Sequence, residues 1–104
     1  MRLVLVPPST AVVLAACGFA SAADINTGRA LAERWCSECH LISEQQRQGS
    51  TEAPPFSEIA ERPGFDAGKV AISLLAPHPP MSGLALSRNE AANLAAYIES
   101  QEQK

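Results

Sequence analysis

The stretch Trp35-Cys36-Ser37-Glu38-Cys39-His40 decides how the rest of this 104-residue chain is interpreted. Two cysteines separated by two residues and followed directly by histidine form the C-x-x-C-H pattern of covalent haem attachment. On a helix, residues three apart lie on one face, so Cys36 and Cys39 can each bond one vinyl group of a haem. His40 can then turn its imidazole onto the iron as the proximal ligand. We therefore predict one covalently bound haem c.

Two other chemistries also use closely spaced cysteines. A C-x-x-C pair after Trp opens thioredoxin-type sites, in which a lowered thiolate pKa drives disulfide exchange. Such a site needs a strand before it and a mixed sheet around it. A zinc site needs a second ligand pair, and the only other histidine, His78, has no cysteine near it. We favour haem over both.

The amino-terminal segment has the pattern of a secretory signal. Residues 3–23 carry no charge, follow Arg2 and include the small residues Ala20-Ser21-Ala22, which predicts cleavage after Ala22. The expected organisation is a signal peptide at 1–22 and one domain at 23–104, which has 82 residues. Export agrees with the cysteine count, because haem is attached in the oxidising space outside the bacterial inner membrane. The predicted location is therefore the periplasm.

Two alternatives for this segment stay open. Leu14-Ala15-Ala16-Cys17 resembles the lipobox of bacterial lipoproteins, in which a lipid on Cys17 would hold the domain at a membrane. The apolar run is also just long enough for an uncleaved span, although Pro7 and Pro8 interrupt it. Either alternative gives a membrane-attached domain that faces the periplasm.

The charge of the chain argues against nucleic acid as a partner. There are 8 basic and 11 acidic side chains, and Arg2 is the only charged residue of the predicted signal, so the mature domain has a net charge of −4. Binding to nucleic acid depends on basic patches. A net negative domain is also not steered broadly toward a strongly acidic partner.

Apolar spacing predicts an all-α domain of three to four helices. The first helix is expected from about Ile25 into the C-x-x-C-H motif, with Leu31, Ala32, Trp35 and Cys39 on one stripe. Gly28 extends that stripe, and a glycine there is explained by a close crossing with another helix. No alternating apolar run of strand length occurs after the signal.

The remaining helices are expected at 57–62, 67–76 and from Ser87 onward. Asp66 is a suitable N-cap for the second of these, with Val70 and Leu74 turned inward, Leu75 as a further candidate, and Pro77 at its end. Ser87-Arg88-Asn89-Glu90 is a capping box. The last helix is expected to bury Ala91, Leu94 and Tyr97 or Ile98 and to fray after Ser100.

Two loops complete the prediction. Residues 41–53 are polar without periodicity and indicate a solvated loop, which Pro54 and Pro55 follow as a stiff connection. Met81 is the only methionine besides the initiator and lies in a proline-rich loop rather than on a helix stripe. Its thioether is therefore the favoured second iron ligand, which would raise the reduction potential. His78 is the competing ligand.

These features together resemble a small bacterial class I cytochrome c, which has one haem. The resemblance extends over the whole mature segment and rests on Cys36-Ser37-Glu38-Cys39-His40, on Ala53-Pro54-Pro55-Phe56, and on Pro80-Met81 ahead of a terminal helix with Tyr97. It implies the cytochrome c fold, in which the helices surround one haem. It also implies a glycine–aromatic crossing of the first and last helices, which matches Gly28 with Tyr97 or a neighbour of Tyr97.

The resemblance further implies how the site works. A proline carbonyl of the middle loop accepts the Nδ1–H of the proximal histidine, and Pro54 is the best match, with Pro55 as the alternative. The expected function is one-electron transfer between periplasmic or membrane-bound redox proteins, such as a dehydrogenase, an oxidase or a bc1-type complex, and not enzymatic catalysis. The alternatives are a haem enzyme or gas-binding protein with a displaceable Met81, and thiol–disulfide exchange.

Overall fold

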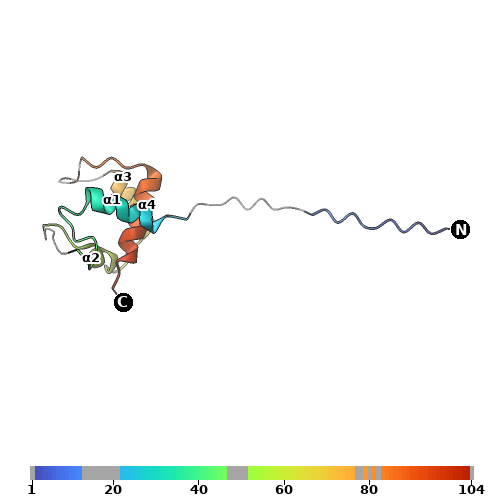
Figure 1. Ribbon diagram of the computed structural model, residues 1–104, viewed down its shortest axis with the longest axis horizontal. Coiled ribbons are helices and arrows are strands. Elements are labelled where there is room, and N and C mark those ends of the chain that lie inside the picture. Colours follow the sequence, from blue (N-terminus) through green and yellow to red (C-terminus); the bar gives the residue numbers. More distant parts are fainter. Residues whose placement is uncertain are drawn as a thin grey trace.

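Four helices make up the regular structure of the described part of the chain. The computed structural model describes residues 2–12, 22–46, 52–76, 79, 81 and 83–103, and within these residues it contains no strand. This confirms the predicted all-α class. The helices are α1 (Ile25–Trp35), α2 (Phe56–Ala60), α3 (Ala67–Leu75) and α4 (Arg88–Ser100), as Figure 1 shows.

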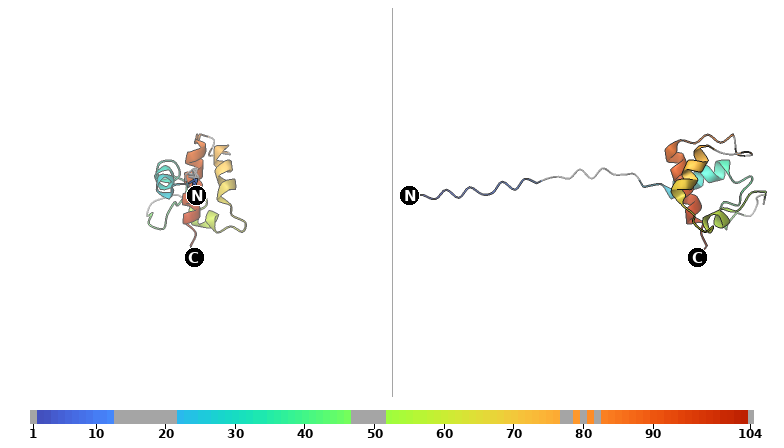
Figure 2. Two further views of the ribbon diagram at one scale, coloured as in Figure 1. Left: turned by 90° about the vertical axis from the view of Figure 1, so that its right-hand side faces the viewer. Right: turned by 180° about the vertical axis from the view of Figure 1, so that it is seen from behind.

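Helix α4 is the centre of the domain and packs against each of the other three helices. Figure 2 shows α1 and α3 on opposite sides of it. The predicted capping box is confirmed at its start: Glu90 N–H donates to Ser87 Oγ at 3.1 Å, and Ser87 N–H donates to Glu90 Oε1 at 2.9 Å. Its apolar stripe contributes more residues to the core than any other described helix, namely Ala91, Leu94, Ala95, Tyr97 and Ile98.

Helices α1 and α4 cross in direct backbone contact at Gly28. A Cβ atom added at Gly28 would lie 2.0 Å from Asn93 O and 2.8 Å from Tyr97 Cβ. Only a residue without a side chain allows the two helices to come this close. The predicted close crossing of Gly28 with Tyr97 is therefore confirmed.

The end of α1 differs from the prediction. The helix stops at Trp35, and the Trp35 side chain is 54% exposed instead of buried, with the Arg34 guanidinium 4.9 Å from its ring centre. The buried row of α1 runs through Gly28, Ala32 and Cys36, which are four residues apart. Because α4 contacts this i, i+4 row, Trp35 points away from it.

Helices α2 and α3 begin close to their predicted positions. Phe56 is the first residue of α2 and is buried. Asp66 caps α3 as predicted, because its side chain accepts a hydrogen bond from Lys69 N–H at 3.1 Å. Leu74 is buried and Val70 packs against the core, whereas the further candidate Leu75 is exposed. Pro77, expected to end this helix, lies outside the described residues.

The segment after the C-x-x-C-H motif is only partly the solvated loop expected from its polarity. Ile42 is 5% exposed and belongs to the core. The Tyr97 hydroxyl donates to Ile42 O at 2.9 Å, so α4 holds this segment against the domain. Residues 47–51 of the same loop lie outside the described residues.

The amino-terminal residues 2–12 form no helix and are exposed. Cys17 and Ala20-Ser21, which carry the lipobox and signal predictions, are not among the described residues. Within the part of the chain that the structure describes, no helix has both the length and the hydrophobicity that crossing a membrane requires.

Candidate haem-attachment site

The two cysteines lie on a tight turn that follows directly on α1. Cys36 caps the helix, its N–H bonded to Ala32 O at 2.9 Å, and the N–H groups of Cys39 and His40 both donate to Cys36 O, at 3.2 and 2.9 Å. The turn keeps Cys36 buried and leaves Cys39 exposed. Both are free thiols.

The environment of Cys36 is the opposite of what disulfide exchange requires. Burial, and secondarily the neighbouring Cys39, raises the pKa of the Cys36 thiol to about 11. A thiol of this kind stays protonated near neutral pH, whereas exchange depends on a lowered thiolate pKa. No sheet surrounds the motif in the described residues, which removes the structural basis of the thioredoxin alternative.

His40 is held by the carbonyl group of Pro54. The distance from His40 Nδ1 to Pro54 O is 2.6 Å, and a carbonyl oxygen can only accept, so Nδ1 carries the proton. Nε2 of the neutral ring then keeps its lone pair for a metal. The Phe56 ring, centred 5.3 Å from the imidazole, packs on it at 50°.

The pairing of two backbone segments brings Pro54 opposite His40. Ala53 N–H donates to Cys39 O at 3.1 Å, and Phe56 N–H donates to Leu41 O at 2.9 Å. Pro54 and Pro55 have no N–H, so the bonds come from the residues on either side of them. The Pro54 carbonyl therefore remains available to the histidine side chain.

Met81 lies on the connection between α3 and α4. Its side chain is half-buried and packs against the hydrophobic core, and its carbonyl accepts the N–H of Leu84 at 3.0 Å. His78, the competing ligand, and Pro80 lie outside the described residues. Met81 is thus ordered against the domain at the part of the chain where the second ligand is expected.

The chemistry of these side chains fits a covalently attached haem. Two free thiols on one turn can each form a thioether. The His40 ring is held at Nδ1 by Pro54 O, which leaves Nε2 available to bind iron. A zinc site finds no support, because within the described ranges no three His, Cys, Asp or Glu side chains gather as a ligand cluster.

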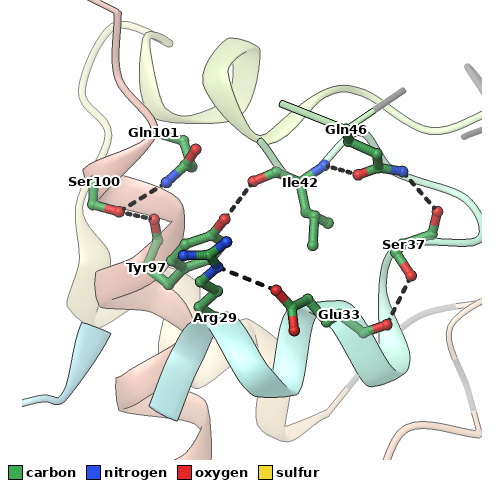
Figure 3. Close-up of polar contacts among 8 residues, drawn as sticks. All are labelled: Arg29, Glu33, Ser37, Ile42, Gln46, Tyr97, Ser100 and Gln101. Atoms are coloured by element: carbon green, nitrogen blue, oxygen red, sulfur yellow. Dashed lines mark hydrogen bonds and ion pairs between the residues drawn. The ribbon is translucent and has the colours of Figure 1, made fainter. Parts of the chain in front are cut away.

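Two residues that support this turn were not predicted from the sequence. Ile42 and Gln46 follow the motif, and Figure 3 shows their contacts with Ser37 and with Tyr97 of α4. A single isoleucine in a polar run gives no periodic signal, and Gln46 is one of several glutamines there. Nothing in the pattern distinguishes either of them.

The comparison with known proteins supports the interpretation of the site. The chain is 47% identical over 81 residues to a protein named cytochrome c-552 from Bradyrhizobium diazoefficiens, and the alignment covers 78% of each chain. No family model and no solved structure matches the chain. Identity at this level over so much of both chains shows that the protein belongs to the family of small bacterial mono-haem c-type cytochromes.

Proposed function

We propose that this protein carries single electrons between redox proteins through one haem c with histidine and methionine as its axial ligands. The observation that supports it most strongly is the pairing of His40 Nδ1 with Pro54 O, 2.6 Å apart, directly after the two free thiols. This hydrogen bond fixes the tautomer and the direction of an imidazole in the position of a proximal ligand.

Cys36 and Cys39 would hold the haem through two thioether bonds. Each S–H would add across a vinyl double bond, with sulfur bonding to one carbon and hydrogen going to the other. This addition consumes no oxidant or reductant and needs the reduced thiol, the form that both cysteines have. The bound haem would supply a couple that alternates between ferric and ferrous iron.

Met81 would provide the second axial ligand. Its packing against the core lowers the entropy cost of presenting the sulfur, and a soft neutral thioether favours ferrous iron. With His40 and Met81 on the iron, no position is left for a substrate, which favours an electron carrier over an enzyme. His78 remains the alternative ligand.

The partners would be redox proteins met in brief encounters over small interfaces. Export by the predicted signal at 1–22 would bring the domain to the periplasm, with lipidation at Cys17 or an uncleaved signal as the routes to membrane attachment. Mass spectrometry of the mature amino terminus distinguishes these routes: Ala23 as the first residue supports the soluble form, and a diacylglyceryl group on Cys17 contradicts it.

The test of the proposal is expression with a bacterial haem-attachment system. The wild-type protein should gain the mass of one haem, resist its extraction by acid acetone, and be reduced and reoxidised reversibly as a one-electron couple. Cys36→Ala/Cys39→Ala should lose the covalent haem. Rapid carbon monoxide binding to the reduced protein at neutral pH would contradict the closed site and favour a gas-binding or enzymatic role.

A further inference from the structure

We propose that Gln46 is a positioning residue that fixes the backbone around His40 and thereby sets the orientation of its imidazole on the iron. This inference rests on the proposed function, since it assigns Gln46 a role toward the proximal ligand. Gln46 lies six residues beyond His40 and does not belong to the C-x-x-C-H motif.

The side-chain amide of Gln46 bridges three backbone groups. Its Oε1 accepts the N–H of Ile42 at 2.8 Å, and its Nε2 lies 3.2 Å from Ser37 O and 3.4 Å from His40 O as their donor. Ser37 lies between the two cysteines and Ile42 lies beyond the histidine. One amide group therefore holds the motif on both sides of His40, as Figure 3 shows for Ser37 and Ile42.

The backbone groups that Gln46 contacts belong to no helix or strand. Residues 36–46 form turns and irregular structure, so no helix or strand pairing is there to satisfy the Ser37 and His40 carbonyls and the Ile42 N–H. A half-buried polar backbone group without a partner is costly, and a side-chain amide can satisfy a donor and an acceptor at once. This explains why a glutamine is suited to the position.

Two hydrogen bonds that do not involve Gln46 also hold this segment, at the carbonyls of Leu41 and Ile42. The Tyr97 hydroxyl donates to Ile42 O at 2.9 Å, and Phe56 N–H donates to Leu41 O at 2.9 Å. With these bonds in place, the amide of Gln46 completes a backbone frame around His40. If the His40 peptide moved, the imidazole ring would turn about the hydrogen bond between its Nδ1 and Pro54 O.

Three variants separate hydrogen bonding from size. Gln46→Met keeps the length of the side chain and removes every hydrogen bond of the amide. Gln46→Glu keeps an acceptor for Ile42 N–H and places carboxylate oxygen against the carbonyls of Ser37 and His40. Gln45→Met is the matched control, because Gln45 is an exposed neighbour in the same segment.

Two measurements on the haem-loaded protein test the proposal. Amide exchange of Ile42 in the reduced form reports the hydrogen bond to Oε1, and the hyperfine-shifted haem methyl resonances of the oxidised form report the plane of the axial imidazole. Gln46→Met should speed Ile42 exchange about tenfold, as expected for one lost hydrogen bond, and should change the methyl pattern. Gln46→Glu should keep the exchange slow and still change the pattern, while Gln45→Met should leave both unchanged.

The outcomes distinguish this inference from the proposed function. A wild-type protein that takes up no covalent haem contradicts the proposed function, and the positioning role with it. A haem-loaded wild type whose methyl pattern is preserved in Gln46→Met overturns the positioning role alone, even where Ile42 exchanges faster. If Gln46→Met does not fold, Gln46→Glu decides, and an unchanged methyl pattern in that variant overturns the inference.

Discussion

Gly28 of α1 and Tyr97 of α4 meet at the crossing of the first and last helices, where a Cβ on Gly28 would lie 2.8 Å from Tyr97 Cβ. The same Tyr97 extends its hydroxyl to Ile42 O, just beyond the turn that carries Cys36 and Cys39. Tyr97 thus links the helix crossing to the turn. We expect a substitution at Gly28 or at Tyr97 to affect the structure of both the crossing and the turn.

Gly28→Ala should destabilise the holoprotein by about 2 kcal/mol. The added methyl group would meet Asn93 O at 2.0 Å, a backbone atom that cannot move without separating the helices. Denaturant unfolding of the holoprotein measures the effect. The control is Gly83→Ala, where an added Cβ meets nothing within 4 Å and stability should stay within about 0.5 kcal/mol. Equal stability of the two variants would contradict the close crossing.

Tyr97→Phe should cost about 1–2 kcal/mol, because Ile42 O loses a buried donor. Burial also raises the pKa of the Tyr97 phenol. A raised folded-state pKa means that the contribution to stability is complete below the unfolded value of about 10 and is lost as the pH rises through the folded value. From pH 9 upward, the free energy of unfolding should therefore fall more steeply with pH in the wild type than in Tyr97→Phe. Equal slopes for the two proteins would refute this coupling.

Ser87→Ala should lower stability by about 1 kcal/mol near neutral pH, since α4 loses its N-cap. The hydrogen bond from the Ser87 backbone N–H lowers the pKa of the Glu90 carboxyl. Its stabilising effect is present above the unfolded pKa of about 4.3 and is lost as the pH falls through the lower folded value. Thermal unfolding between neutral and acidic pH measures this effect. The melting temperature should depend less on pH in Glu90→Gln than in Glu99→Gln, which is a control on the same helix.

Met81→Ala should abolish the weak far-red absorption band that sulfur bonding to ferric haem produces, and should lower the reduction potential. His78→Ala should leave both unchanged. Spectra of the two oxidised variants, recorded beside the wild type, decide which residue binds the iron. If the band persists in Met81→Ala, His40 is paired with another ligand.

Local chemistry was sufficient to predict where helices begin. Ser87 and Asp66 cap α4 and α3 because a short polar side chain can accept the first free N–H groups of a helix, and that information lies within four residues. The C-x-x-C-H motif was recognisable for the same reason. Its functional groups are adjacent in the chain.

Apart from the crossing at Gly28, the features that depend on tertiary contacts were not predictable from spacing alone. Trp35 shares a helical stripe with Ala32 in the sequence, yet the direction from which α4 approaches leaves it exposed. Ile42 is buried in the core, and Tyr97, 55 positions away, donates a hydrogen bond to its carbonyl. The support that Gln46 gives to the turn has the same origin, since its partners are backbone groups that every sequence has.

The crossing of α1 with α4 also bears on the order in which the chain can fold. Asp24 N–H bonds to Asn93 Oδ1 across 69 positions, and among the described helices α1 packs only against α4. Closing so long a loop costs entropy that only the finished contact repays. The contact that holds α1 against α4 therefore forms only once the last helix of the domain is present. The first and last helices thus depend on each other, and a chain that lacks either would leave the Gly28 crossing unformed.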